Sequence, residues 1–163
     1  MMGAGKSTVG ERLSVRRGWP HVDNDRALEE LSGLSQSELQ DVPVTRLNSL
    51  EAEHARRLCE ADPPMIAGVA ASVADDPVAM DLLADAGFLV YLALTPDSAL
   101  ARVGRAGPGR QILDGEHAVA TLRERFSRRD PVFRSHADLV LDASRPPEEI
   151  CDRIVEAWTG WSS

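Results

Sequence analysis

The sequence predicts an α/β fold in which helices cover both faces of a doubly wound parallel sheet, in one domain over residues 1–163. Two observations predict it. Apolar segments with the composition of buried strands alternate from end to end with segments of helical periodicity. The chain has 163 residues, of which 43% are hydrophobic and 27% are charged, and this is enough for one domain with its own core.

Each element follows from a local pattern. Strands are expected at 19–23, 65–71, 88–94 and 137–142, where apolar runs are short and bounded by turn residues. Helices are expected at 7–17, 26–31, 46–60, 76–86, 96–103, 118–129 and 147–158. Ser35 and Glu38 form a capping box that starts a further short helix. The glycine-rich segment 104–117 is expected to be a flexible lid.

The amino-terminal segment carries the most specific motif. Gly3, Gly5, Lys6 and Ser7 match the second half of the phosphate-binding pattern G-x-x-x-x-G-K-[ST], and a helix follows directly. Glycines let backbone N–H groups converge on phosphate oxygens, Lys6 supplies a cation, and the Ser7 hydroxyl suits Mg²⁺. The alternative is a glycine-rich turn capped by Ser7. The predicted site for ATP and Mg²⁺ comprises Gly3, Ala4, Gly5, Lys6, Ser7 and Thr8.

The upstream half of that pattern is absent from the sequence. Its first glycine would fall one residue before Met1, and the buried central strand that leads into such a loop would lie further upstream. We therefore expect either a truncated reading of a longer gene or a product that lacks its central strand. Truncation is favoured, because the other elements alternate as expected.

Composition limits the partners. The formal net charge of −8 argues against nonspecific binding to nucleic acid or to anionic membranes. The longest apolar run, 88–94, is too short to span a bilayer, and we expect no signal peptide. Cys59 and Cys151 have neither metal nor redox spacing and are expected to be core residues. We expect a cytoplasmic monomer that acts on a small molecule.

Two acidic residues follow the first expected strand. Asp23 and Asp25 lie at its carboxyl end, the edge at which ligands of open α/β sheets collect. In an extended segment the side chains at i and i+2 share a face, so both carboxylates are predicted to face the phosphate site. One would hold Mg²⁺ through water, and the other would orient or deprotonate a substrate hydroxyl. The alternative is a helix N-cap beside a solvated acid.

Arginines are the remaining candidates. Arg102, Arg105 and Arg110 lie in or beside the glycine-rich segment, and an arginine-bearing flap would close over a transferring phosphoryl group and exclude water. The alternative is a solvated surface loop. Arg128 and Arg129 are expected at a helix C-terminus, where they would complement the helix dipole. Alternatively, Arg129 grips a substrate carboxylate through two hydrogen bonds.

Together these motifs resemble the shikimate kinase family, small kinases with the three-layer α/β/α fold of P-loop NTPases. The segments that carry the resemblance are 3–10, 23–29, 33–38, 89–92, 100–113 and 129–138. The resemblance implies ATP-dependent phosphorylation of shikimate in aromatic amino-acid biosynthesis.

The resemblance also implies a role for each matching residue. The residues that would handle phosphate and Mg²⁺ are Lys6, Ser7, Asp23 and Arg110. Asp25 would contact the accepting hydroxyl, and Arg129 would bind the substrate carboxylate. Arg102 and Pro146 would lie beside adenine.

Two departures from the family pattern fall on the acceptor side. The F-R-x-x-E segment aligns with 47–51, so its arginine is Asn48 here, and the G-G-G segment aligns with Val69, Ala70 and Ala71. Losing a bidentate arginine contact costs about 2–3 kcal/mol of binding. Added Cβ atoms would crowd a ligand lying against bare backbone. The alternatives are therefore a kinase of another polyol or sugar acid, and a catalytically weak ATP-binding regulatory protein.

Overall fold

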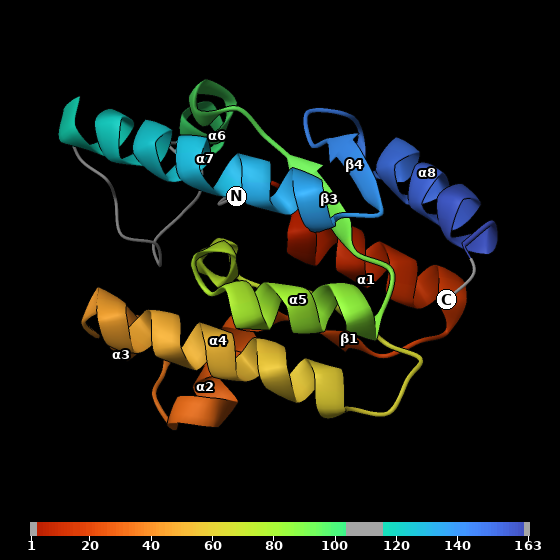
Figure 1. The fold of residues 1–163 in the computed structure, drawn as a ribbon, viewed down its shortest axis with the longest axis horizontal. Helices are drawn as coiled ribbons and strands as arrows, with labels where there is room; N and C mark the ends of the chain where they lie inside the picture. Colours follow the sequence, from red (N-terminus) through yellow and green to blue (C-terminus); the bar gives the residue numbers. More distant parts are fainter. Residues whose placement is uncertain (1–2, 104–115, 162–163) are drawn as a thin grey trace.

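The structure, a computed structural model, describes residues 3–103 and 116–161 (Figure 1). The elements run in the order α1 (Lys6–Arg17), β1 (His21–Val22), α2 (Asn24–Ser32), α3 (Gln36–Gln40), α4 (Val44–Glu60), β2 (Ile66–Ala67), the 3₁₀ helix η1 (Ala71–Asp75), α5 (Pro77–Ala86), β3 (Val90–Ala93), α6 (Pro96–Val103), α7 (Glu116–His136), β4 (Leu139–Asp142) and α8 (Pro147–Thr159).

The strands form two separate parallel pairs. β1 pairs with β2, with His21 opposite Ile66, and β3 pairs with β4, with Val90 opposite Leu139. Helices connect the two strands of each pair, as parallel pairing requires, and the predicted α/β class is confirmed. Within the described ranges no strand joins the two pairs, so the expected sheet is present as two halves.

A cavity of about 730 Å³ lies between the two half-sheets. The apolar residues in its walls include Val9, Leu13, Ile66, Tyr91, Leu92 and Ile154. These side chains belong to α1, β2, β3 and α8, so the inner edges of β2 and β3 face one another across the cavity. This is the position at which a central strand leading into α1 would complete one continuous sheet.

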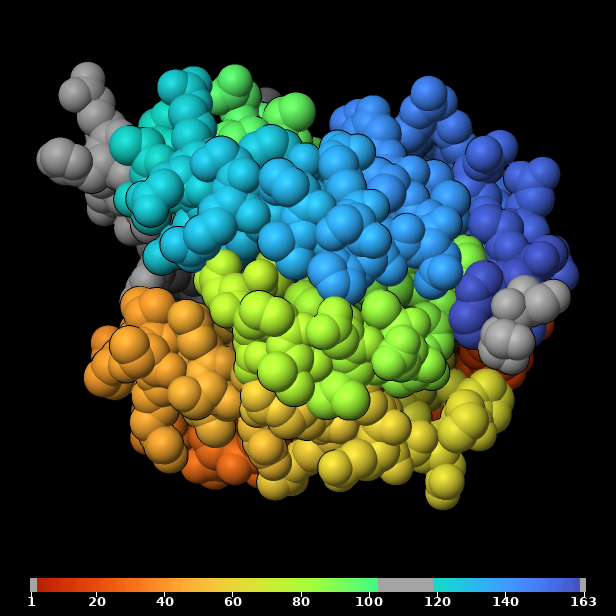
Figure 2. All heavy atoms as spheres, viewed as in Figure 1, coloured from red at the N-terminus to blue at the C-terminus, as the bar shows by residue number. Residues whose placement is uncertain are grey.

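Helices cover the half-sheets on both sides. α1 packs against α8 (Figure 1), and together with β3 and β4 they enclose a first core cluster that contains Leu13 and Cys151. α4, α5 and α7 lie side by side and cover one face of the molecule as neighbouring bands (Figure 2). They enclose a second core cluster, which contains Met80, Tyr91 and Phe133. In the described ranges, no helix is both long enough and apolar enough to span a membrane.

The paired strands are shorter than predicted. The segment 65–71 is paired only over Ile66–Ala67, and the chain then turns into η1, where Val73 and Ala74 are buried in the second core cluster. Cys59 also differs from expectation, because it is only half-buried.

Helix α7 is longer than predicted. It continues through Pro131 to His136, although proline usually ends a helix. The rings of Phe133 and Tyr91 stack with their centroids 5.0 Å apart, and this packing holds the last turns of α7 against β3. Tertiary packing therefore outweighs the local preference at this proline.

Candidate active site

The amino-terminal loop enters α1 with the geometry of an anion site. Gly3 and Gly5 both have positive φ, 75° and 82°, a conformation that glycine adopts without steric cost. Gly5 is the N-cap of α1 and adds no side-chain cap, and the first turn of α1 contains no acidic residue. The positive end of the helix dipole therefore faces the loop, as phosphate binding requires. Ala4 is buried beneath the loop, and Thr8 is exposed on the helix.

Two predicted Mg²⁺ residues are in direct contact. Ser7 Oγ donates a hydrogen bond of 2.6 Å to Asp23 Oδ2, which links the first turn of α1 to the end of β1. A hydroxyl and a carboxylate are both oxygen ligands of the kind that Mg²⁺ prefers. The two side chains therefore fit a Mg²⁺ ion, which they would hold beside the loop and which would neutralise phosphate charge there.

Asp23 also caps α2. Its Oδ1 accepts a hydrogen bond of 3.0 Å from the N–H of Asp25, so the N-cap alternative is correct and coexists with the Ser7 contact. Burial raises the pKa of Asp23, but hydrogen bonds from Ser7 and from the backbone of Asp25 and Arg26 outweigh burial and lower the pKa below its ordinary value. Asp23 is therefore ionised at neutral pH, and the Asp25 side chain is exposed beside it.

Arg102 on α6 connects the phosphate loop to the end of β4. Its Nη1 donates to the Gly3 carbonyl oxygen at 3.2 Å, and its Nη2 donates to the Ala143 carbonyl oxygen at 2.8 Å. Pro146 lies in the same connection between β4 and α8, where it is exposed and directly precedes α8. Arg102 and Pro146 are the two residues predicted to flank adenine. The hydrogen bond from Arg102 to Ala143 links α6 to the connection that contains Pro146. Arg105 and Arg110 lie outside the described residues.

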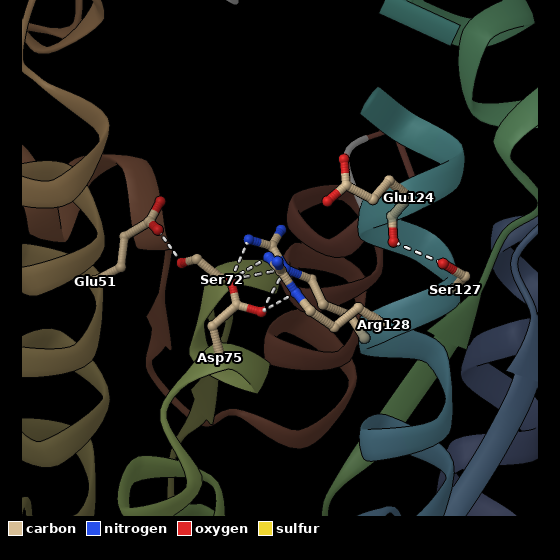
Figure 3. A network of polar contacts seen from close by, with 7 residues as sticks. Glu51, Ser72, Asp75, Glu124, Ser127 and Arg128 are labelled. Atoms are coloured by element: carbon tan, nitrogen blue, oxygen red, sulfur yellow. Dashed lines mark hydrogen bonds and ion pairs between the residues drawn. The ribbon is translucent and has the colours of Figure 1, made fainter. Parts of the chain in front are cut away.

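Glu51 on α4 is a site residue to which the sequence analysis assigned no role. Its carboxylate accepts a hydrogen bond from Ser72 Oγ on η1 (Figure 3). Burial raises the pKa of Glu51 above its ordinary value, although the Ser72 hydrogen bond and the charges of Arg129 and Lys6 act in the opposite direction; the charge of Asp25 adds to the rise. Glu51 therefore lies where α4, η1, α7 and the phosphate loop approach one another.

Arg129 lies inside α7, not at its C-terminal end as predicted, so a role in complementing the helix dipole is wrong. Its Nε lies 3.1 Å from both carboxylate oxygens of Asp75, and its Nη2 lies 2.6 Å from Oδ2. Arg128 reaches the same carboxylate at 3.1 and 3.2 Å (Figure 3). The predicted acceptor-binding arginine is thus paired with a carboxylate of the chain itself.

Glu51, Ser72 and Asp75 could not be identified from local sequence. The Asp-Asp-Pro sequence predicts a helix start, and this is correct for Asp76, whose Oδ1 accepts the Ala79 N–H at 3.1 Å. Nothing near Asp75 marks it as the partner of a residue 54 positions later in the chain. The only available signal was the glutamate of the F-R-x-x-E segment.

The two departures on the acceptor side have different structural consequences. Asn48 is half-buried on α4, one helical turn before Glu51 and on the same side of the helix. Ala70 is buried, and Val69 and Ala71 pack against the second core cluster. These side chains therefore contribute to packing of the protein itself, and the crowding of a ligand by their Cβ atoms stays a prediction.

The fold and the site together define a class of protein. A glycine loop at a helix N-terminus, a hydroxyl–carboxylate pair beside it, and a buried arginine and a half-buried glutamate nearby are the components of a P-loop phosphotransferase that acts on a small acceptor.

Comparison with known proteins identifies the family within that class. The family model for shikimate kinase matches residues 2–159. The shikimate kinase of Halorhodospira halophila is 33% identical over 164 residues, covering 99% of this chain and 92% of that protein. The shikimate kinase of Stenotrophomonas maltophilia is 33% identical, covering 98% of this chain and 89% of that protein. The solved structure of shikimate kinase from Acinetobacter baumannii in complex with shikimate has a TM-score of 0.82 at 22% identity, covering 98% of this chain and 89% of that one.

The chain belongs to the shikimate kinase family. The predicted P-loop NTPase fold and the predicted small-molecule kinase are confirmed, and ATP with Mg²⁺ is the typical cofactor of this family.

Proposed function

We propose that this chain transfers the γ-phosphoryl group of ATP to a hydroxyl group of shikimate, as a step in aromatic amino-acid biosynthesis. The observation that carries the proposal is the hydrogen bond of 2.6 Å between Ser7 and Asp23. It brings the phosphate loop against the carboxylates at the end of β1, in a chain that belongs to this family.

Each residue of the site has a task in this reaction. The loop amides and Lys6 bind the β- and γ-phosphates, and Ser7 and Asp23 hold Mg²⁺, which when bound neutralises charge on the transferring group. Asp25 accepts a hydrogen bond from the attacking hydroxyl, and Arg129 orients the acceptor through its carboxylate. Arg110 stabilises the transferring group from the lid at 104–117, while Arg102 and Pro146 flank adenine.

The remaining expectations belong to the same proposal. We propose one kinase domain over residues 1–163 that works as a monomer in the cytoplasm, without nucleic-acid or membrane partners. The net charge of −8 supports the absence of nucleic-acid and anionic-membrane partners, because a negatively charged chain is repelled by polyanionic surfaces.

A second candidate is a kinase of a related acid or polyol. Asn48 stands where the family has an arginine, and Arg129 is already paired with Asp75, so the acceptor side has weaker means of binding a carboxylate. A weakly catalytic ATP-binding regulatory protein would share these features.

The test is a coupled assay of ADP release with Mg·ATP over a panel of shikimate, quinate, gluconate and cyclitols. We expect shikimate to stimulate release well above the rate without acceptor. Stimulation by another acceptor alone would move the assignment to the second candidate. No stimulation by any acceptor, with ATP still bound, would favour the regulatory protein.

A further inference from the structure

The acceptor side contains an internal anion in contact with the cation predicted to bind the acceptor. Asp75, the last residue of η1, makes hydrogen bonds of 2.6–3.1 Å to Nε and Nη2 of Arg129. This is the two-oxygen geometry with which an arginine recognises a carboxylate ligand. A ligand carboxylate that used the same face of the guanidinium would have to share or replace these contacts.

The Arg129–Asp75 ion pair is partly shielded from solvent. The Arg129 side chain is 11% exposed, and the Asp75 side chain is 25% exposed. Charge pairs of this kind are screened less by water than surface pairs are. Burial raises the pKa of Asp75, but the hydrogen bonds and charge of Arg129, together with those of Arg128, lower it below its ordinary value. Asp75 is therefore an anion at neutral pH.

The pair also lies on the acceptor side of the site. Ser72, one turn earlier on η1, contacts Glu51, and the charges of Arg129, Lys6 and Asp25 all act on that glutamate (Figure 3). Asp75 thus belongs to the same group of side chains as the residues assigned to phosphate and hydroxyl. An anionic acceptor that bound Arg129 here would have to compete with the carboxylate of Asp75.

We propose that Asp75 is a specificity-determining residue that competes with the carboxylate of the acceptor for Arg129. This inference rests on the proposed function, since it concerns the acceptor of that reaction. Asp75 weakens binding of acceptors that carry a carboxylate and leaves neutral acceptors unaffected. The acceptor displaces the Asp75 carboxylate from Arg129 when it binds. The displaced Asp75 carboxylate keeps Arg128, which is exposed, as its partner.

The test compares Asp75→Asn with the wild-type chain by calorimetric titration with shikimate and with its methyl ester, which lacks the negative charge. Asparagine keeps the shape and one oxygen for Arg129 but removes the charge. We expect shikimate to bind about tenfold more tightly to the variant. Without the competing anion, Arg129 is available to the shikimate carboxylate in a larger fraction of the molecules. The methyl ester should bind equally to both proteins.

Asp76→Asn is the matched control. It removes the same charge one residue away, but Asp76 pairs with Arg56 and caps α5, a position where asparagine serves as well as aspartate. It should leave both affinities unchanged. If Asp75→Asn has an altered thermal midpoint, Asp75→Ser repeats the comparison with a smaller neutral side chain.

The outcomes separate this inference from the proposed function. Unchanged or weaker shikimate binding in Asp75→Asn, equal gains for shikimate and its ester, or no shikimate binding by any variant would overturn the competition. A charge-selective gain in a chain that never phosphorylates shikimate would uphold the competition and refute the proposed function.

Discussion

The phosphate side and the acceptor side of the site are built differently. On the phosphate side, Gly3 and Gly5 shape the loop, α1 presents its positive end, and Ser7 contacts an ionised Asp23. The pairing of Ser7 with Asp23 leaves both oxygen ligands side by side next to the loop. On the acceptor side, Arg129 is paired with Asp75, so the chain already satisfies the group that the acceptor would use.

This difference reflects the chemistry of the two halves. Phosphoryl transfer needs the same phosphate geometry for every acceptor, so the sequence pattern of the phosphate side is constrained. Acceptor recognition depends on a few side chains whose pairing can change with little effect on the phosphate groups. Differences in specificity are therefore expected to arise on the acceptor side.

The largest expected effect is on the phosphate side. Lys6→Ala should reduce ATP turnover by about 10³-fold or more, because it removes a cation that stabilises the transferring phosphoryl group. The thermal midpoint should stay close to that of the wild-type chain. Arg12→Ala is the control, since it removes a cation from the same helix that pairs with Glu148 far from the loop. Wild-type turnover in Lys6→Ala would refute the assignment of the loop.

The cavity between the half-sheets gives the second prediction. An added apolar segment of about ten residues that ends in glycine, placed directly before Met1, should raise stability by several kcal/mol, because a central strand buries its side chains on both faces. Thermal midpoints of the two proteins measure this. A segment of equal length with polar residues at alternate positions is the control. Equal midpoints for the apolar extension and the original chain would count against a strand site between β2 and β3.

Two substitutions of Asp23 distinguish its predicted role beside Mg²⁺ from its role as the N-cap of α2. Asp23→Asn and Asp23→Ala should both lower turnover by about 10²-fold, because each removes the carboxylate beside Mg²⁺. Asp23→Ala should lose about 1 kcal/mol more stability than Asp23→Asn, because asparagine still caps α2 and alanine does not. Turnover assays and denaturant unfolding measure the two effects. Equal stability losses in the two variants would show that the charge, and not the cap, stabilises this helix.

The smallest expected effect is on the pH dependence of stability, which should have opposite signs for Glu51 on the acceptor side and Asp23 on the phosphate side. Burial raises the pKa of Glu51 above its ordinary 4.5, so the folded protein holds this proton more tightly than the unfolded chain. The contribution of Glu51 to the stability of the wild-type chain therefore falls as pH rises above 4.5, until the raised pKa is passed. Glu51→Gln cannot lose the proton, and its thermal midpoint relative to wild type should rise over that range. A difference that does not change with pH would contradict the raised pKa.

The opposite sign is expected on the phosphate side. The pKa of Asp23 is lowered from 3.8, so its contribution is present above pH 3.8 and is lost as pH falls below that value. In Asp23→Asn the midpoint relative to wild type should rise on acidification. Equal pH dependence in the two substitutions would remove the electrostatic contrast between the sides.

Local pattern predicted the parts that depend on local chemistry. The capping box at Ser35, the loop into α1 and the helix that starts near Asp76 each follow from a few adjacent residues, and the structure has all three. The continuation of α7 through Pro131 could not be predicted, because it depends on the stacking of Phe133 against a ring 42 positions earlier, on Tyr91. Pairings between distant elements have no local signature.

The same limit applied within the site. Lys6, Ser7 and Asp23 were predicted from the phosphate-loop pattern and from the end of the first strand, and the structure places Ser7 against Asp23. Glu51 and Asp75 were missed because their importance depends on side chains from other elements. The acceptor side is therefore the part of the molecule for which the structure adds most.

The central claim is that ATP bound at the phosphate loop transfers its γ-phosphoryl group to a hydroxyl of shikimate. Phosphorus NMR of the chain with Mg·ATP and shikimate tests it directly. We predict that one phosphate monoester forms for each ADP released, and that neither product accumulates with Lys6→Ala. Release of ADP with inorganic phosphate alone, or no release of ADP at all, would contradict the claim.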